Sequence, residues 1–132
     1  MNGNIHKIWG ERRRILLTDK CEIDLLYLKK DTFCSTHHHK YKINRFVVVK
    51  GQVRIETGFG HHTLKENESW DVYPPLIHRF VPLTDAIMIE VAFVEEGKIN
   101  PDDINRISQG GRIINGKEMT HNEMKEKGLL DL

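Results

Sequence analysis

The sequence predicts an all-β chain folded as an antiparallel barrel or sandwich. Short segments with alternating apolar and polar residues recur about every 8–12 positions through the first hundred residues, as in such folds. Turn-forming residues, among them Asp19, Gly58 and the pair Pro74-Pro75, separate these segments. A length of 132 residues suits one domain that buries a sizeable core. These observations favour sheet packing over a helical bundle.

Strands alternate with polar bends in the N-terminal half of the chain. In the segment 22–29 apolar side chains fall on both faces, which indicates a strand covered on both sides. After a polar bend comes a strand on which Asn44, Phe46 and Val48 share one face. The expected strands of this half cover residues 14–18, 22–29, 33–39 and 44–50.

The next strands are shorter until the last one. Val53, Ile55 and Thr57 alternate with Arg54 and Glu56, which is the pattern of a half-buried strand. The final strand is the most apolar segment of the chain, so we expect it near the centre of a sheet. The expected strands of this half cover residues 53–57, 62–64, 70–73, 79–81 and 86–94.

Helix signals are confined to the C-terminal part. Asn100 precedes a proline and two acids, a cap followed by favourable first-turn residues, so we expect a short helix to about residue 107. Thr120 and Glu123 have capping-box spacing and Gly128 is a plausible stop, which predicts a helix over residues 121–127. We therefore expect a barrel domain over residues 1–110 and a C-terminal extension over residues 111–132, with a short helix packed on the barrel.

Composition excludes several classes of protein. The net charge of +1 leaves no electrostatic footprint for nucleic acid, and the basic run Arg12 to Arg14 reads as a solvated surface or an anion contact. No apolar run reaches the roughly 18 residues of a membrane span, and no secretory leader is visible. Two cysteines, Cys21 and Cys34, do not make a disulfide framework, so we expect a cytoplasmic protein.

Three histidines have the pattern of a metal site. His37 and His39 are two residues apart on an expected strand and therefore face the same side. His78 follows Pro74-Pro75 at the start of a later strand. Imidazole suits several divalent transition metals, so the sequence predicts one metal ion inside a barrel, and the alternative is a metal-free polar pocket. His38 is expected to face the opposite side.

The spacing of these residues resembles the two motifs of the cupin superfamily. After His37 and His39 come four residues, then Asn44, six more residues, and Gly51; a proline and His78 match the second motif. Over about residues 8–108 the chain is most similar to the cupin domain of type II mannose-6-phosphate isomerases. Further matching segments lie at residues 9–10, 47–51, 66–69, 77–79, 89–91 and 102–106.

This resemblance implies a single-domain cupin, an antiparallel jelly-roll β-barrel with short C-terminal helices, and a homodimer. It implies that His37, His39 and His78 hold one divalent ion of zinc, iron, manganese or nickel. Asn44 stands where the family carries a glutamate ligand. It is expected to be a weak oxygen ligand or a group just behind the ligands, without the charge of a carboxylate.

The function implied is metal-dependent chemistry on a sugar or sugar phosphate, in particular aldose–ketose isomerisation. Glu90, in the middle of an apolar strand, either faces the cavity as the catalytic base or pairs with Arg79 or Arg54. Arg79 and Tyr41 are the candidates for binding substrate phosphate or hydroxyls. Two alternatives remain open: an iron dioxygenase with three histidine ligands, and a sugar-binding cupin without catalysis.

Overall fold

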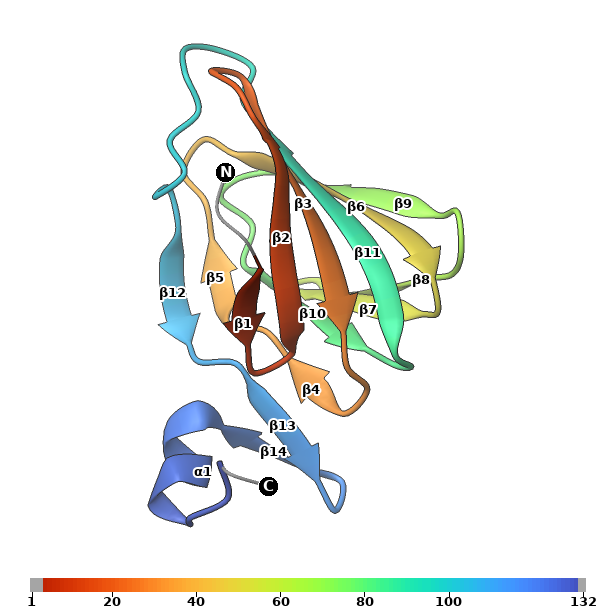
Figure 1. The fold of residues 1–132 in the computed structure, drawn as a ribbon. Helices are drawn as coiled ribbons and strands as arrows, with labels where there is room; N and C mark the ends of the chain where they lie inside the picture. The colour runs from red at the N-terminus through yellow and green to blue at the C-terminus, as the bar shows by residue number, and fades with distance from the viewer. Residues whose placement is uncertain (1–3, 131–132) are drawn as a thin grey trace.

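The computed structural model describes residues 4–130, and Figure 1 shows two sheets curved around a common interior. All strand pairs in this part of the chain are antiparallel. The larger sheet has the order β1 (Ile5–Lys7), β2 (Gly10–Leu17), β3 (Cys21–Leu28), β11 (Ala86–Phe93), β6 (Ile43–Lys50) and β9 (Ser69–Val72). The second has the order β12 (Asn105–Ser108), β5 (Thr36–His38), β10 (His78–Pro82), β7 (Val53–Thr57) and β8 (Gly60–Leu64).

A small third sheet lies at one end of the barrel. It joins β14 (Lys117–Thr120), β13 (Gly111–Ile114) and β4 (Thr32–Phe33), and it is followed by helix α1 (His121–Glu126). Figure 1 shows β13, β14 and α1 together beyond β4. The predicted all-β class and jelly-roll barrel are therefore confirmed.

The core lies between the two large sheets because alternate residues of each strand point inward. Phe46 and Val48 of β6 are 1% and 0% exposed, and they pack with Ile55 of β7 and Phe80 of β10 from the opposite sheet. Trp9 belongs to the same cluster, with its ring centroid 5.1 Å from that of Phe80. The Trp9 side chain therefore packs inside the barrel.

Most expected strands form, with shifted ends. The first is longer than predicted, since β2 already begins at Gly10. That position needs glycine: its φ is +141°, and an added Cβ would come within 1.8 Å of the Tyr27 carbonyl oxygen. The predicted strand over residues 33–39 is divided into β4 and β5, because β4 pairs with β13 whereas β5 pairs with β10 and β12.

The prediction of a short helix ending near residue 107 was wrong. Residues 105–108 instead form β12, which pairs with β5 along the edge of the second sheet. The carboxylate of Asp103 accepts hydrogen bonds from the backbone N–H groups of Lys40, Tyr41 and Lys42 at 2.8, 2.9 and 3.1 Å. The acid that looked like a first-turn helix residue therefore fastens a loop, and strand pairing overrides the local helix signal.

The helix expected over residues 121–127 is confirmed as α1, complete with its capping box between Thr120 and Glu123. The preceding hairpin β13–β14 was not expected from the sequence. No helix among residues 4–130 is long and apolar enough to cross a membrane.

Truncation of a core leucine should destabilise the protein much more than truncation of an exposed apolar residue. Leu64→Ala removes a fully buried side chain of β8 and should lower the free energy of unfolding by about 2–5 kcal/mol. Val49→Ala on β6, where the side chain is 46% exposed, should change it by no more than about 0.5 kcal/mol. Chemical denaturation of both variants measures the difference, and equal losses would contradict the assignment of the core.

Candidate metal centre

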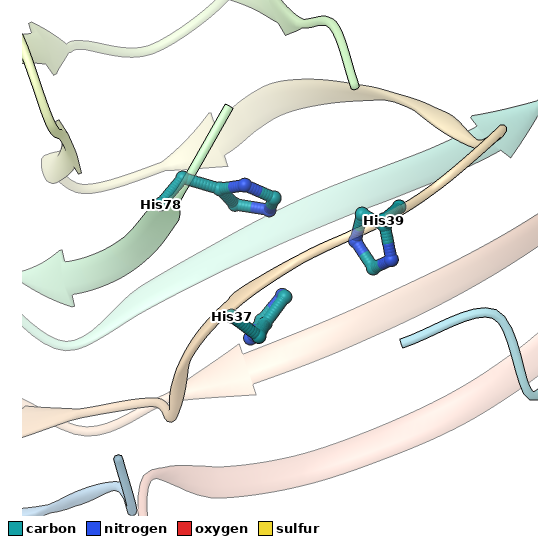
Figure 2. Close-up of side chains that lie close together, drawn as sticks. All are labelled: His37, His39 and His78. Carbon is teal, nitrogen blue, oxygen red and sulfur yellow. The ribbon is translucent and has the colours of Figure 1, made fainter. Parts of the chain in front are cut away.

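Three histidine side chains meet inside the barrel. His37 on β5 and His78 at the start of β10 are directly paired across the sheet. His39, two residues after His37, comes directly after the end of β5. One ring nitrogen of each lies within 4.8 Å of those of the other two. Figure 2 shows the three rings turned toward the same space, as the His-x-His spacing and the later histidine predicted.

Main-chain carbonyls fix the orientation of all three rings. The Nδ1 atoms of His37, His39 and His78 lie 2.8, 2.6 and 3.0 Å from the carbonyl oxygens of residues 35, 103 and 76. A carbonyl oxygen only accepts, so each Nδ1 carries the proton and donates. Each Nε2 is then left with its lone pair, which is the form that binds metal ions.

Burial keeps these rings neutral. Desolvation lowers the pKa of His37 to about 3 and that of His78 to about 4, helped by the neighbouring imidazoles, and it also lowers the pKa of His39. Near pH 7 a proton therefore does not compete for the Nε2 lone pairs.

The donor set fits a divalent transition metal. The Nε2 of His78 is buried and has no hydrogen-bond partner within residues 4–130, an arrangement that costs free energy unless something binds there. Imidazole nitrogens suit zinc, iron, nickel and copper. The group of His37, His39 and His78 is therefore a possible metal site, with no carboxylate among its members.

Asn44 lies beside this group on β6. Its Nδ2 donates to the Nε2 of His39 at 3.1 Å and to a carboxylate oxygen of Glu90 at 3.2 Å. Its Oδ1 is buried without a partner in the described chain. The amide thus presents its nitrogen to His39, and rotation of the side-chain amide would present the oxygen instead.

Glu90 on β11 lines the same cavity as His37 and His39, which has a volume of about 420 Å³. Burial, reinforced by the charge of Asp24 on the neighbouring strand, raises the pKa of Glu90 to about 7. Of the two placements left open by the sequence, the structure has the one that faces the cavity.

Arg79 and Tyr41 do not lie at the cavity. Arg79 donates two hydrogen bonds to Glu118 and one to Glu56, and its guanidinium lies over the ring of Phe33. Tyr41 is 64% exposed in a separate surface hollow. Their proposed contact with substrate therefore finds no support in their positions.

Sequence reasoning missed a set of buried charges next to the histidines. Glu22 and Asp24 point inward from β3 and are 5% and 4% exposed. Arg14 donates to both, at 2.9 and 2.6 Å, and Lys42 donates to Glu22 at 3.2 Å. The available signal was the period of two along the strand, which puts Glu22 and Asp24 on the same face as Leu26. That face continues into the core.

Comparison with known proteins identifies the family. The family model described as "Mannose-6-phosphate isomerase C-terminal" matches residues 1–109. The chain belongs to this family. No curated protein matches it.

Solved cupin structures share the fold of this family member. KdgF from Halomonas sp. is 16% identical, with a TM-score of 0.60 over 65% of this chain and 79% of that chain. An RmlC-like cupin from Shewanella frigidimarina is 19% identical, with a TM-score of 0.59 over 65% and 77%. Oxalate decarboxylase from Bacillus subtilis is 16% identical, with a TM-score of 0.66, and the match covers 79% of this chain but 29% of that one.

Metal analysis of variants tests the histidine group. The wild-type protein incubated with zinc, iron, manganese or nickel should retain about one ion per chain. His78→Ala removes one of the three imidazoles and should lose most of that metal, whereas His61→Ala on the exposed part of β8 should keep it. Elemental analysis after gel filtration measures the content. Absence of metal from the wild type with all four ions would contradict the metal centre.

The two cysteines should differ in reactivity. Burial raises the pKa of Cys34 to about 12, so at pH 8 only about one part in ten thousand of it is thiolate. A disulfide reagent should therefore label one thiol quickly in the native protein and two after unfolding. Cys21→Ser should abolish the fast reaction. A fast reaction that persists in this variant would show that Cys34 is accessible.

Proposed function

We propose that this cupin is a metal-dependent isomerase that interconverts an aldose phosphate and a ketose phosphate, with mannose 6-phosphate as the first substrate to test. His37, His39 and His78 would hold one divalent ion, with the side-chain oxygen of Asn44 as an additional weak ligand. When bound, such an ion polarises a carbonyl oxygen of the substrate as a Lewis acid.

One observation carries the proposal: Glu90 lines the histidine cavity and is separated from His39 only by the amide nitrogen of Asn44. Isomerisation requires a base that removes a proton from the carbon next to the carbonyl and returns it to the former carbonyl carbon. A carboxyl group with a pKa of about 7 can be present in both the accepting and the donating form near neutral pH.

The surrounding residues support this role. Asn44 donates to one oxygen of Glu90 and so fixes the position of the carboxylate relative to the histidines. Arg14 and Lys42 are hydrogen-bonded to Glu22 and Asp24, which compensates part of the negative charge near Glu90. His37, Asn44 and His78 are only 7%, 2% and 2% exposed, and such burial strengthens electrostatic interactions with a bound substrate.

A second candidate function follows from the all-histidine donor group. Without a carboxylate ligand, it also suits a ferrous dioxygenase acting on a thiol. Oxygen uptake by the iron-loaded protein with small thiols, in the absence of sugar isomerisation, would favour this alternative. Shifts in melting temperature with sugars but no turnover of either kind would favour a sugar-binding protein without catalysis.

For the assembly we propose a homodimer that uses the exposed C-terminal part of β2. Ile15, Leu16 and Leu17 are 44%, 40% and 47% exposed there, a run of apolar side chains that a second copy would cover. Trp9 is buried in the core and is not available for this contact.

Replacement of the proposed base should stop isomerisation without removing the metal. Glu90→Gln keeps the size of the side chain but cannot take up a proton, so kcat should fall by about 10²–10⁴-fold. Glu96→Gln, on an exposed loop, should retain the wild-type rate. Proton exchange at C2 of mannose 6-phosphate in D₂O, followed by NMR, measures the step directly.

Metal content of the same samples distinguishes the causes. Equal metal in wild type and Glu90→Gln with lost exchange supports a base. Wild-type exchange rates in Glu90→Gln would contradict that role, and absence of exchange in metal-loaded wild type would contradict the isomerase proposal itself.

A further inference from the structure

Three cationic side chains gather at the histidine cavity. Lys7 comes from β1, Arg12 from β2 and Arg106 from β12, and all three line the same cavity as His37 and Glu90. They are distant in sequence and come from β2 and from β1 and β12, which are edge strands of the two large sheets (Figure 1). All three side chains line the cavity.

No acidic side chain of the described residues forms a salt bridge with these cations. Within residues 4–130 no salt bridge or side-chain hydrogen bond involves Lys7, Arg12 or Arg106. The Nε of Arg12 is also buried without a hydrogen-bond partner. Burial together with the charges of Arg12 and Arg106 lowers the pKa of Lys7, so the three groups lie within electrostatic reach of one another.

The nearby acids are already engaged. Glu22 and Asp24 accept hydrogen bonds from Arg14 and Lys42. Glu11 accepts from Asn4 and lies 3.3 Å from His6. Glu90 also faces Arg12, but its pKa of about 7 leaves it only partly charged near neutral pH. The described residues therefore compensate the repulsion among the three cations only in part, which favours binding of an anion between them.

The cluster lies next to both Glu90 and the histidines. The charge of Arg12 partly opposes the rise in the pKa of Glu90, and Arg106 on β12 is the direct cross-strand partner of His37. A group bound by these side chains would thus hold the rest of a small ligand against Glu90 and the histidines.

We propose that Lys7, Arg12 and Arg106 form a subsite for the phosphate group of a phosphomonoester ligand. A phosphate carries up to two negative charges and three acceptor oxygens, which three cations can satisfy, and arginine matches its geometry with two parallel N–H donors. The orientation of a substrate carbon toward Glu90 rests on the proposed isomerase function, whereas phosphate binding does not. This subsite takes over the role that the sequence had suggested for Arg79.

Binding of inorganic phosphate tests the subsite independently of catalysis. Calorimetric titration at constant ionic strength should show binding to the wild type, weakened about tenfold or more in Arg12→Gln and in Arg106→Gln. Arg13→Gln is the matched control, because it removes the same charge from the next residue, which is exposed and does not line the cavity. It should bind phosphate like the wild type, and acetate should bind more weakly than phosphate to all of them.

Each outcome bears on the proposal. Three results would overturn it. The first is absence of phosphate binding by the wild type. The others are wild-type affinity in both Arg12→Gln and Arg106→Gln, or a loss in Arg13→Gln as large as in these two variants. Acetate binding as strong as phosphate would overturn the assignment to a phosphomonoester. Loss of binding in His78→Ala with retention in Arg12→Gln would place the anion at the histidines instead. Phosphate binding that depends on Arg12 in a protein without isomerase activity would support the subsite and contradict only the proposed function.

Discussion

Each histidine of the central group donates its Nδ1 proton to a main-chain carbonyl, and the rest of the site depends on these three hydrogen bonds. The carbonyls belong to residues 35, 76 and 103, which lie on three separate segments of the barrel. The fold therefore selects the tautomer and the direction of every ring. Because burial also disfavours protonation, the lone pairs of His37, His39 and His78 remain available near neutral pH.

The amide at position 44 is consistent with the charges around it. Asn44 is 3.2 Å from the carboxylate of Glu90, and Glu22 and Asp24 lie on the adjoining strand β3. A second carboxylate at position 44 would add a like charge in direct contact with Glu90 inside a poorly solvated cavity. The neutral amide instead donates to both Glu90 and His39. The negative charge of this site therefore comes from β11 and β3 and not from the histidine motif.

The C-terminal segment is joined to the barrel through Arg79. Its guanidinium connects Glu56 on β7 with Glu118 on β14 and covers the ring of Phe33 on β4. The family model ends at residue 109, close to the expected boundary at residue 110, while Gly110 and His121 line the histidine cavity. His121 of the segment 111–130 therefore forms part of the cavity wall.

The sequence by itself determined most strands of the two large sheets, the shared face of alternate residues on them and the three histidines. Alternation places His37 with His39 on one side, and Asn44, Phe46 and Val48 on one face, because these relations depend only on the period of a strand. The capping box of α1 was readable for the same reason, since all its contacts are local. The alternation of Val53 and Ile55 with Arg54 and Glu56 likewise distinguished the two faces of that strand.

Only the tertiary structure decided which distant side chains become neighbours. Pairing of β11 with β3 and β6 brings Glu90 beside Asp24 and near Asn44, and pairing of β12 with β5 turns an expected helix into a strand that brings Arg106 to His37. Register between strands far apart in the chain depends on packing of the whole core, which no local pattern encodes. For that reason the sequence assigned anion binding to Arg79, whereas the fold uses this residue as an anchor.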